Sequence, residues 1–98
     1  MSSAVELNLE RFAPLQGTTF VLQGPSGPVP LELVGVSALR GGLPGQRAPF
    51  SLLFLGPDAT HLPQQIWPLE HDVLGRLELF LVPVGPAEGR MRYEAIFS

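Results

Sequence analysis

The sequence predicts an all-β protein: a small six-stranded antiparallel barrel or rolled sheet with a short N-terminal helix. Segments of alternating apolar and polar residues are separated at short intervals by Gly and Pro clusters, which is typical of short antiparallel strands. The length of 98 residues and the hydrophobic fraction of 45% suit one compact core. Closure into a barrel would also remove exposed strand edges. We therefore expect a single domain over residues 1–98, in which residues 1–6 form a loose tail.

The first elements follow from capping and turn residues. Asn8 is placed to cap a short helix over residues 9–12, which should end near Pro14. Leu9 and Phe12 would then cover one open end of the sheet. Strands are expected over residues 18–23 and 29–39, with a Gly- and Pro-rich turn between them.

The middle of the chain contains a loop and two further strands. Residues 40–47 are too rich in Gly and Pro for regular structure. Phe50–Leu55 is apolar at nearly every position, which predicts burial on both faces, or burial on one face and a partner on the other. Residues 64–69 form a fourth strand, and Pro63 and Pro68 indicate an edge strand or a bulged strand.

The last quarter of the chain, residues 75–98, predicts a hairpin around a five-residue turn, Gly85–Gly89. Its alternation separates an apolar inner face from an outer face, so a one-residue slip would exchange the two. The expected pairs are Leu77 with Phe97, Leu79 with Ala95, Leu81 with Tyr93, Phe80 with Glu94, Val82 with Arg92 and Glu78 with Ile96.

Composition and charge exclude several classes of chemistry. The chain has no Cys, so it cannot form disulfides, thiolate metal sites or a cysteine nucleophile, and it has no Lys for a P-loop or a Schiff base. The formal charge of −3 argues against nucleic acid as the main partner. No signal peptide and no apolar run of about 18 residues is visible. We expect a cytoplasmic protein with no membrane contact, although export within a larger assembly stays open.

Two histidines are the only candidates for acid–base or metal chemistry. His71 lies between Glu70 and Asp72, which allows a general base or a pair of metal ligands. Adjacent residues of an extended chain point to opposite faces, however, so both carboxylates share a side that excludes His71. The alternative is a polar turn in which the imidazole bonds to nearby backbone. Asp58 and His61 are too few to hold zinc. We expect no catalytic residue, no metal ligand and no cofactor.

The remaining isolated polar and aromatic residues have simpler explanations. Arg40 and Arg47 flank the Gly-rich loop and could converge on an anion, but two loop arginines are more often solvated or paired with nearby acids. Trp67 and Tyr93 are single aromatic residues on strands. Because base-stacking platforms come with basic neighbours, we expect these two to pack in the core or at its rim.

The outer face of the last hairpin is the strongest candidate for a functional surface. Four apolar residues share the face opposite the predicted core, and charged residues flank them. Such patches are typical of contact with another chain, unless the N-terminal helix or another strand covers them. The interface candidates are Phe80, Val82, Val84, Ile96 and Arg92, with Glu78, Glu94 and Arg90 beside them.

Four segments of the chain carry a resemblance to a known family: residues 47–54, 69–71, 77–85 and 92–97. With them the chain, from Phe12 to Phe97, resembles a family of short bacterial domains of unknown function. That likeness implies a small β-barrel-like fold and a companion role to phage-tail-like collar or fibre proteins, and no site residue can be transferred. Trp67 departs from the Tyr usual there, and Ser98 from the usual Asn.

The sequence as a whole favours a non-enzymatic protein-interaction or assembly module, as an accessory or structural subunit that binds a protein partner or a further copy of itself. A small-molecule-binding barrel is an alternative. It is less favoured because Phe20, Leu52, Phe54 and Trp67 should fill the interior. A small enzyme using His71 with Glu70 or Asp72 is the least favoured alternative.

Overall fold

The computed structural model describes residues 8–39, 49–58 and 62–97. The predicted short helix and six strands are confirmed, although several strand ends differ by one to three residues. The elements are the helix α1 (Leu9–Phe12), the 3-10 helix η1 (Ala13–Leu15), and the strands β1 (Thr19–Gly24), β2 (Gly27–Ala38), β3 (Phe50–Leu55), β4 (Gln65–His71), β5 (Gly75–Ala87) and β6 (Arg90–Phe97). The expected tail at residues 1–6 and the loop at 40–47 lie outside the described residues.

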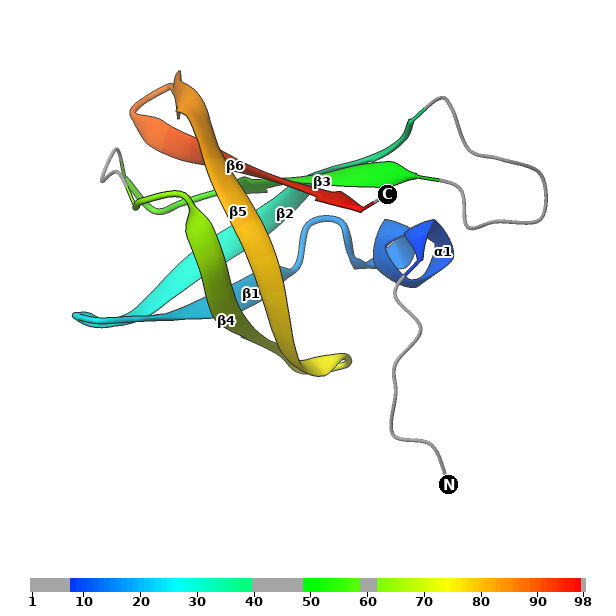
Figure 1. Cartoon of the computed structure of the whole chain (residues 1–98), viewed down its shortest axis with the longest axis horizontal. Helices are drawn as coiled ribbons and strands as arrows, with labels where there is room; N and C mark the ends of the chain where they lie inside the picture. The colour runs from blue at the N-terminus through cyan, green and yellow to red at the C-terminus, as the bar shows by residue number, and fades with distance from the viewer. Residues whose placement is uncertain (1–7, 40–48, 59–61, 98) are drawn as a thin grey trace.

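The six strands form a closed antiparallel barrel in the order β1-β2-β3-β6-β5-β4, with β4 returning to β1 (Figure 1). Four of the six contacts join strands that follow one another in the chain. The contacts β3–β6 and β1–β4 close the barrel. The structure is therefore a barrel and not an open rolled sheet.

Large apolar side chains fill the barrel. Every strand contributes buried apolar side chains, and Phe20, Leu52, Phe54 and Trp67 all point inward as predicted. In β3, the inner side chains are buried while Ser51, Leu53 and Leu55 on the outer face are half-buried. Because the interior is occupied by side chains of the protein itself, any ligand would have to use grooves on the outside.

Helix α1 closes one end of the barrel, beside the C-terminal end of β6 (Figure 1). The Asn8 side chain accepts a hydrogen bond from the Arg11 amide at 3.0 Å, which confirms the predicted cap. Phe12 is fully buried, and its ring centre lies 6.4, 5.9 and 5.7 Å from those of Phe20, Phe50 and Phe97. The helix therefore packs against the inside of the barrel, not against its outer face.

The predicted register of the β5–β6 hairpin is wrong by two residues. Strand β5 continues to Ala87, and the turn contains only Glu88 and Gly89, which have φ angles of 52° and 79°. Two successive positive φ values are typical of the tight turn that joins twisted strands. A bulge at Val84 shifts the register again near this turn.

The corrected pairs change the partners but keep the faces. Tyr93 lies opposite Pro83 instead of Leu81, and Val82 lies opposite Glu94 instead of Arg92. Since side chains alternate with a period of two, a shift of two residues leaves each one on its expected side of the sheet. Leu77, Leu79, Leu81, Tyr93 and Ala95 are accordingly buried, as predicted.

Strand β5 changes partner half-way along its length. Residues 75–81 pair with β4, whereas residues 82–87 pair with β6. The ladder between β5 and β6 stops at Val82 and Glu94, and beyond this point the two strands diverge (Figure 1). We call this opening the β5–β6 fork.

A second weak junction joins β4 to β1, which pair only at Val21–Glu70 and Leu22–Leu69. Pro68 lies just outside these pairs. Its missing N–H therefore costs no hydrogen bond there, so β4 accommodates Pro68 although it is paired on both sides. The prediction of an edge strand or a bulged strand is wrong, because the barrel is closed and neither ladder of β4 has a register shift.

Candidate outer binding surface

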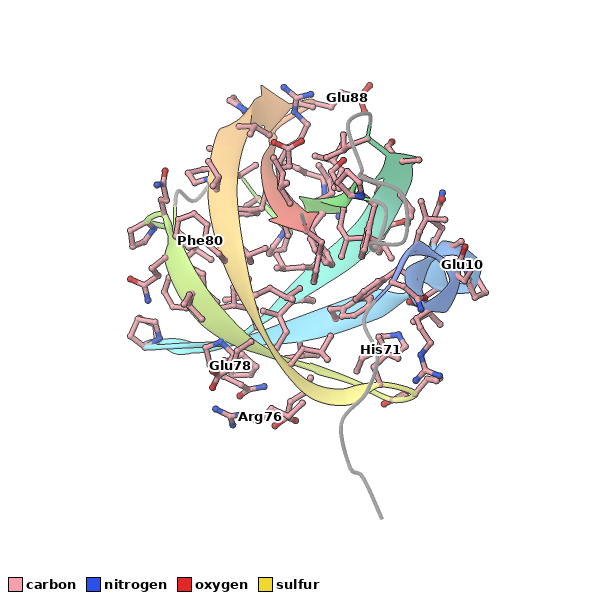
Figure 2. The ribbon with its side chains drawn as sticks, turned by 45° about the vertical axis from the view of Figure 1, so that its right-hand side comes forward. Glu10, His71, Arg76, Glu78, Phe80 and Glu88 are labelled. Carbon is pink, nitrogen blue, oxygen red and sulfur yellow. The ribbon has the colours of Figure 1, made fainter. Side chains whose placement is uncertain are left out.

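The outward face of the β4–β5 hairpin carries two large apolar side chains directly opposite each other. Ile66 and Phe80 are paired across the two strands, and 62% and 48% of their surfaces are exposed. Figure 2 shows Phe80 on the outside of the barrel. Val82 and Val84 follow Phe80 on β5, the first half-buried and the second exposed. We call Ile66, Phe80, Val82 and Val84 the outer apolar strip.

Ile96 is exposed but does not belong to this strip. A continued ladder would have brought it opposite Phe80, but the β5–β6 fork separates their two strands. It lies opposite Ser51 of β3 instead, with 61% of its surface exposed. The predicted patch is therefore divided, and the N-terminal helix, which packs inside the barrel, does not cover it.

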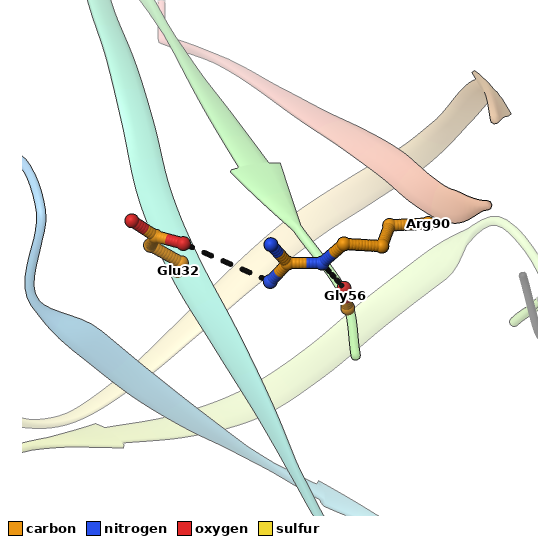
Figure 3. A network of polar contacts seen from close by, with 3 residues as sticks. All are labelled: Glu32, Gly56 and Arg90. Carbon is orange, nitrogen blue, oxygen red and sulfur yellow. Dashed lines mark hydrogen bonds and ion pairs between the residues drawn. The ribbon is translucent and has the colours of Figure 1, made fainter. Parts of the chain in front are cut away.

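The arginines expected to flank the strip are largely engaged elsewhere. Arg92 donates hydrogen bonds to the carbonyls of Gly85 and Val84, at 3.2 and 3.3 Å, and so supports the bulge. Arg90 donates to the Gly56 carbonyl at 2.7 Å and lies 3.7 Å from the Glu32 carboxylate (Figure 3). It thus ties the start of β6 to the residue after β3 and to β2.

Glu78 and Arg76 provide exposed charge beside the strip. They lie two positions apart on the outer face of β5, and their charged groups are 3.7 Å apart. Both side chains are well exposed (Figure 2), so their mutual attraction contributes little and each stays available to a charged partner.

His71 is buried, and both of its ring nitrogens are engaged. Nδ1 accepts hydrogen bonds from the Val73 and Leu74 amides at 3.0 and 3.4 Å. It therefore carries no proton, and Nε2–H donates to the Thr18 hydroxyl at 3.0 Å. That hydroxyl in turn donates to the Leu15 carbonyl at 2.6 Å. The polar-turn interpretation of His71 fits this geometry.

The same bonds give His71 a structural task. They join the turn between β4 and β5 to the segment that leads into β1, and the imidazole also packs 4.2 Å from the Phe20 ring. Glu70 and Asp72 are exposed on the outside, away from the ring nitrogens. The arrangement leaves no unoccupied imidazole nitrogen facing a carboxylate.

Two surface grooves flank the short β1–β4 junction. One, of about 430 Å³, is lined mostly by polar residues: Thr19, Val21, Gln23, Glu70, His71, Asp72, Gly75 and Arg76. The other, of about 480 Å³, lies between the β1–β2 turn and the start of β4 and includes Pro63 and Trp67. The Trp67 indole is itself buried and donates to the Pro63 carbonyl at 3.0 Å. Trp67 therefore packs in the core, as predicted.

Tyr93 is a core residue whose hydroxyl makes a polar contact. Its hydroxyl accepts a hydrogen bond from the Leu62 amide at 3.2 Å. Burial raises the pKa of this phenol, the Leu62 amide opposes that rise, and the charge of Asp58 adds to it.

Three other candidate residues from the sequence, Arg40, Arg47 and His61, lie outside the described residues. Within residues 8–39, 49–58 and 62–97, no three His, Asp or Glu side chains gather closely enough to hold one metal ion. In the same part of the chain, no helix is long and apolar enough to cross a membrane.

Sequence reasoning missed Ile66, the most exposed member of the strip. The available signal was its position beside Trp67, because neighbouring strand residues face opposite sides and Trp67 was assigned to the core. Its pairing with Phe80 depends on the register of the β4–β5 hairpin, which the sequence analysis does not predict.

Residues 7–97 match DUF6916, described as a domain of unknown function. The chain belongs to the DUF6916 family. Neither a curated protein nor a solved structure matches it significantly. Membership in DUF6916 agrees with the resemblance to a small uncharacterised domain, whereas the bacterial origin and the link to phage-tail-like proteins stay predictions.

Proposed function

We propose that this DUF6916 domain is a non-enzymatic protein-interaction or assembly module that binds through its outer apolar strip. The observation that carries the proposal is the exposed Ile66–Phe80 pair. The chain buries the neighbouring Trp67 and Leu79 on the same two strands, so it leaves a large aromatic residue and an isoleucine in water only on the outward face.

The composition of this surface resembles that of protein interfaces. An aromatic and an aliphatic side chain form its centre, and charged groups such as Glu78 and Arg76 form its edge. Interface centres are depleted of charge and enriched in aromatic residues, with a polar rim around them. Burial of such side chains by a partner would contribute about 25 cal/mol per Å² of apolar surface.

The family resemblance supplies a context for such a module. An accessory or structural subunit of a phage-tail-like or surface assembly would need a small rigid domain with a docking face. Both a different protein and a second copy of this chain meet that need, and the charge of −3 makes nucleic acid a poorer partner.

A capture experiment with matched variants tests the proposal. The tagged protein is expressed in its native host as wild type, as Ile66→Ser/Phe80→Ser and as Val73→Ser, and co-purifying proteins are identified by mass spectrometry. Val73 is the control because it is apolar and 70% exposed but lies in the β4–β5 turn, outside the strip.

The proposal expects one defined partner, or extra copies of the chain, with wild type and Val73→Ser and at least a tenfold loss with the double variant. Circular dichroism must show that all three proteins are folded. Equal recovery of the partner with all three proteins would show that the strip is not the binding surface.

A further inference from the structure

We propose that the free edge of β5 at the β5–β6 fork accepts an extended segment of a partner protein as an additional antiparallel strand. This inference rests on the proposed interaction function and specifies how the partner binds. It predicts main-chain hydrogen bonds to β5, with the outer apolar strip providing side-chain contacts beside them.

The pairing of the hairpin shows which backbone groups face the fork. His71 and Gly75 are paired across a three-residue turn, so they must form a hydrogen-bonded pair. Hydrogen-bonded and non-hydrogen-bonded pairs alternate along an antiparallel ladder, so Leu77 and Leu79 direct their N–H and C=O groups towards β4. Arg76, Glu78 and Phe80 therefore direct theirs away from β4, towards the fork.

Pro68 supports this assignment independently. It lies opposite Glu78, where a hydrogen-bonded pair would need an N–H that proline lacks. On the fork side, β5 has no strand partner between Gly75 and Leu81 among the described residues. The backbone N–H and C=O groups of Arg76, Glu78 and Phe80 thus form a row of donors and acceptors along this edge of β5.

The size of the apolar surface favours a strand over a globular partner. A stable dimer of folded proteins buries about 800 Å² on each side, which the two large exposed side chains of the strip cannot supply by themselves. Main-chain bonds along an added strand give affinity with little apolar area. The same edge also lies beside exposed Phe80 on one arm of the fork and exposed Ile96 on the other.

The charges on β5 specify the chemistry of the segment. Arg76, Glu78 and Phe80 all point outward, so the residues opposite them should be acidic, basic and apolar. The intervening residues would lie beside inward-facing Leu77 and Leu79 and should be β-branched. From its N-terminus to its C-terminus, the partner segment should therefore have residues of these types: β-branched, apolar, β-branched, basic, β-branched and acidic.

The probe is a blocked synthetic peptide, Lys-Gly-Val-Ile-Thr-Lys-Val-Glu-Gly-Lys, and the matched control exchanges its inner Lys and Glu. Binding is followed by NMR on the full-length protein at low salt. We expect the probe to bind at least fivefold more tightly than the control. We also expect rapid amide exchange at Arg76, Glu78 and Phe80 in the free protein, and at least tenfold slower exchange when the peptide is bound.

Two variants at one position separate backbone from side-chain recognition. Glu78→Pro removes the edge-facing N–H and leaves the bonds to β4 intact, and Glu78→Ala removes only the carboxylate. We expect at least a tenfold loss of peptide binding for the first and a loss of about threefold for the second. The exchange measurements on wild type decide the question if Glu78→Pro does not fold.

Several results would overturn strand addition. These are slow exchange at the three amides in the free protein, no binding of the probe, or equal binding by Glu78→Pro and wild type. Concentration-dependent dimerisation that protects the same amides would assign the edge to a second copy and not to a partner segment. A partner captured in the host that needs Ile66 and Phe80 but tolerates Glu78→Pro would leave the interaction function standing while removing this mode of binding.

Discussion

The four-stranded sheet β1–β2–β3–β6 and the β4–β5 hairpin both contribute to the buried core but differ in how far backbone pairing joins them to their neighbours. In the sheet, β1 and β3 pair over their whole lengths and β2 passes from β1 to β3 at Glu32, whereas the hairpin joins β1 at only two positions and β6 through only the second half of β5. The hairpin also carries three of the most exposed apolar residues, Ile66, Val73 and Phe80. Backbone pairing therefore attaches the hairpin over only part of its length, and side-chain packing in the core supports the rest.

This difference explains why binding is expected at the hairpin. An unpaired strand edge is a template for another strand, and proteins usually block it or cover it. Here one arm of the fork combines such an edge with exposed Phe80. Strand β2 also changes partner, from β1 to β3 at Glu32, but the apolar residue exposed beside that point, Val34, is smaller and less exposed than Phe80.

The largest expected loss of stability tests whether the packing of helix α1 at one end of the barrel supports both the sheet and the hairpin. Phe12→Ala removes a fully buried ring that contacts Phe20, Phe50 and Phe97. We expect a loss of about 3–5 kcal/mol in the free energy of unfolding, measured with urea. Glu10→Ala, on the exposed side of the same helix, should change it by less than about 0.5 kcal/mol. Equal effects would mean that the helix does not fill the end of the barrel.

His71 tests the attachment of the hairpin turn. His71→Ala removes the acceptor of two turn amides and the bond to Thr18, and we expect about 2 kcal/mol of lost stability in urea unfolding. His71→Asn is the matched variant, because its side-chain oxygen can still accept from the turn amides. It should recover about half of the loss. If both variants match wild type, the hydrogen bonds of His71 do not anchor the turn.

Tyr93 connects the sheet to the segment before β4. Tyr93→Phe removes the acceptor of the Leu62 amide and should cost about 1 kcal/mol at neutral pH. Because the folded state raises the pKa of the phenol, the unfolded chain ionises first, at a pH of about 10. The stability of wild type should therefore fall as pH rises past this value towards the folded pKa, while that of Tyr93→Phe lacks this part of the fall.

The alkaline titration is easy to interpret in this chain. Tyr93 is the single tyrosine, and there is no Lys or Cys to titrate in the same range. Ultraviolet absorbance of the phenolate reports its pKa directly. A titration midpoint at or below the ordinary value near 10 would contradict the dominance of burial.

Local patterns predicted the elements, but global closure decided the pairing. Alternation and turn residues placed β3 and the capped helix correctly because these depend on near neighbours. The register predicted for the last hairpin is wrong because Gly85 and Pro86 are residues typical of a loop, whereas β5 continues through them. The chain turns instead at Glu88, which has a positive φ that non-glycine residues seldom adopt.

The candidate surface was predictable in part for the same reason. The outward direction of Phe80 and Ile96 follows from alternation, which a two-residue register error preserves. Their separation at the fork, and the pairing of Phe80 with Ile66, depend on how β5 is shared between β4 and β6. No short-range pattern encodes that division.

The smallest expected effect is the most direct test of the contrast between the two faces of the hairpin. Leu79 and Phe80 are neighbours on β5, the first buried in the barrel and the second 48% exposed. Leu79→Ala should cost about 2–5 kcal/mol of stability, since it leaves a cavity in the core. Phe80→Ser should change the free energy of unfolding by no more than about 0.5 kcal/mol, because water already surrounds much of the ring. A cost for Phe80→Ser close to that of Leu79→Ala would show that the ring stabilises the fold itself, and its exposure would then give no reason to expect a partner.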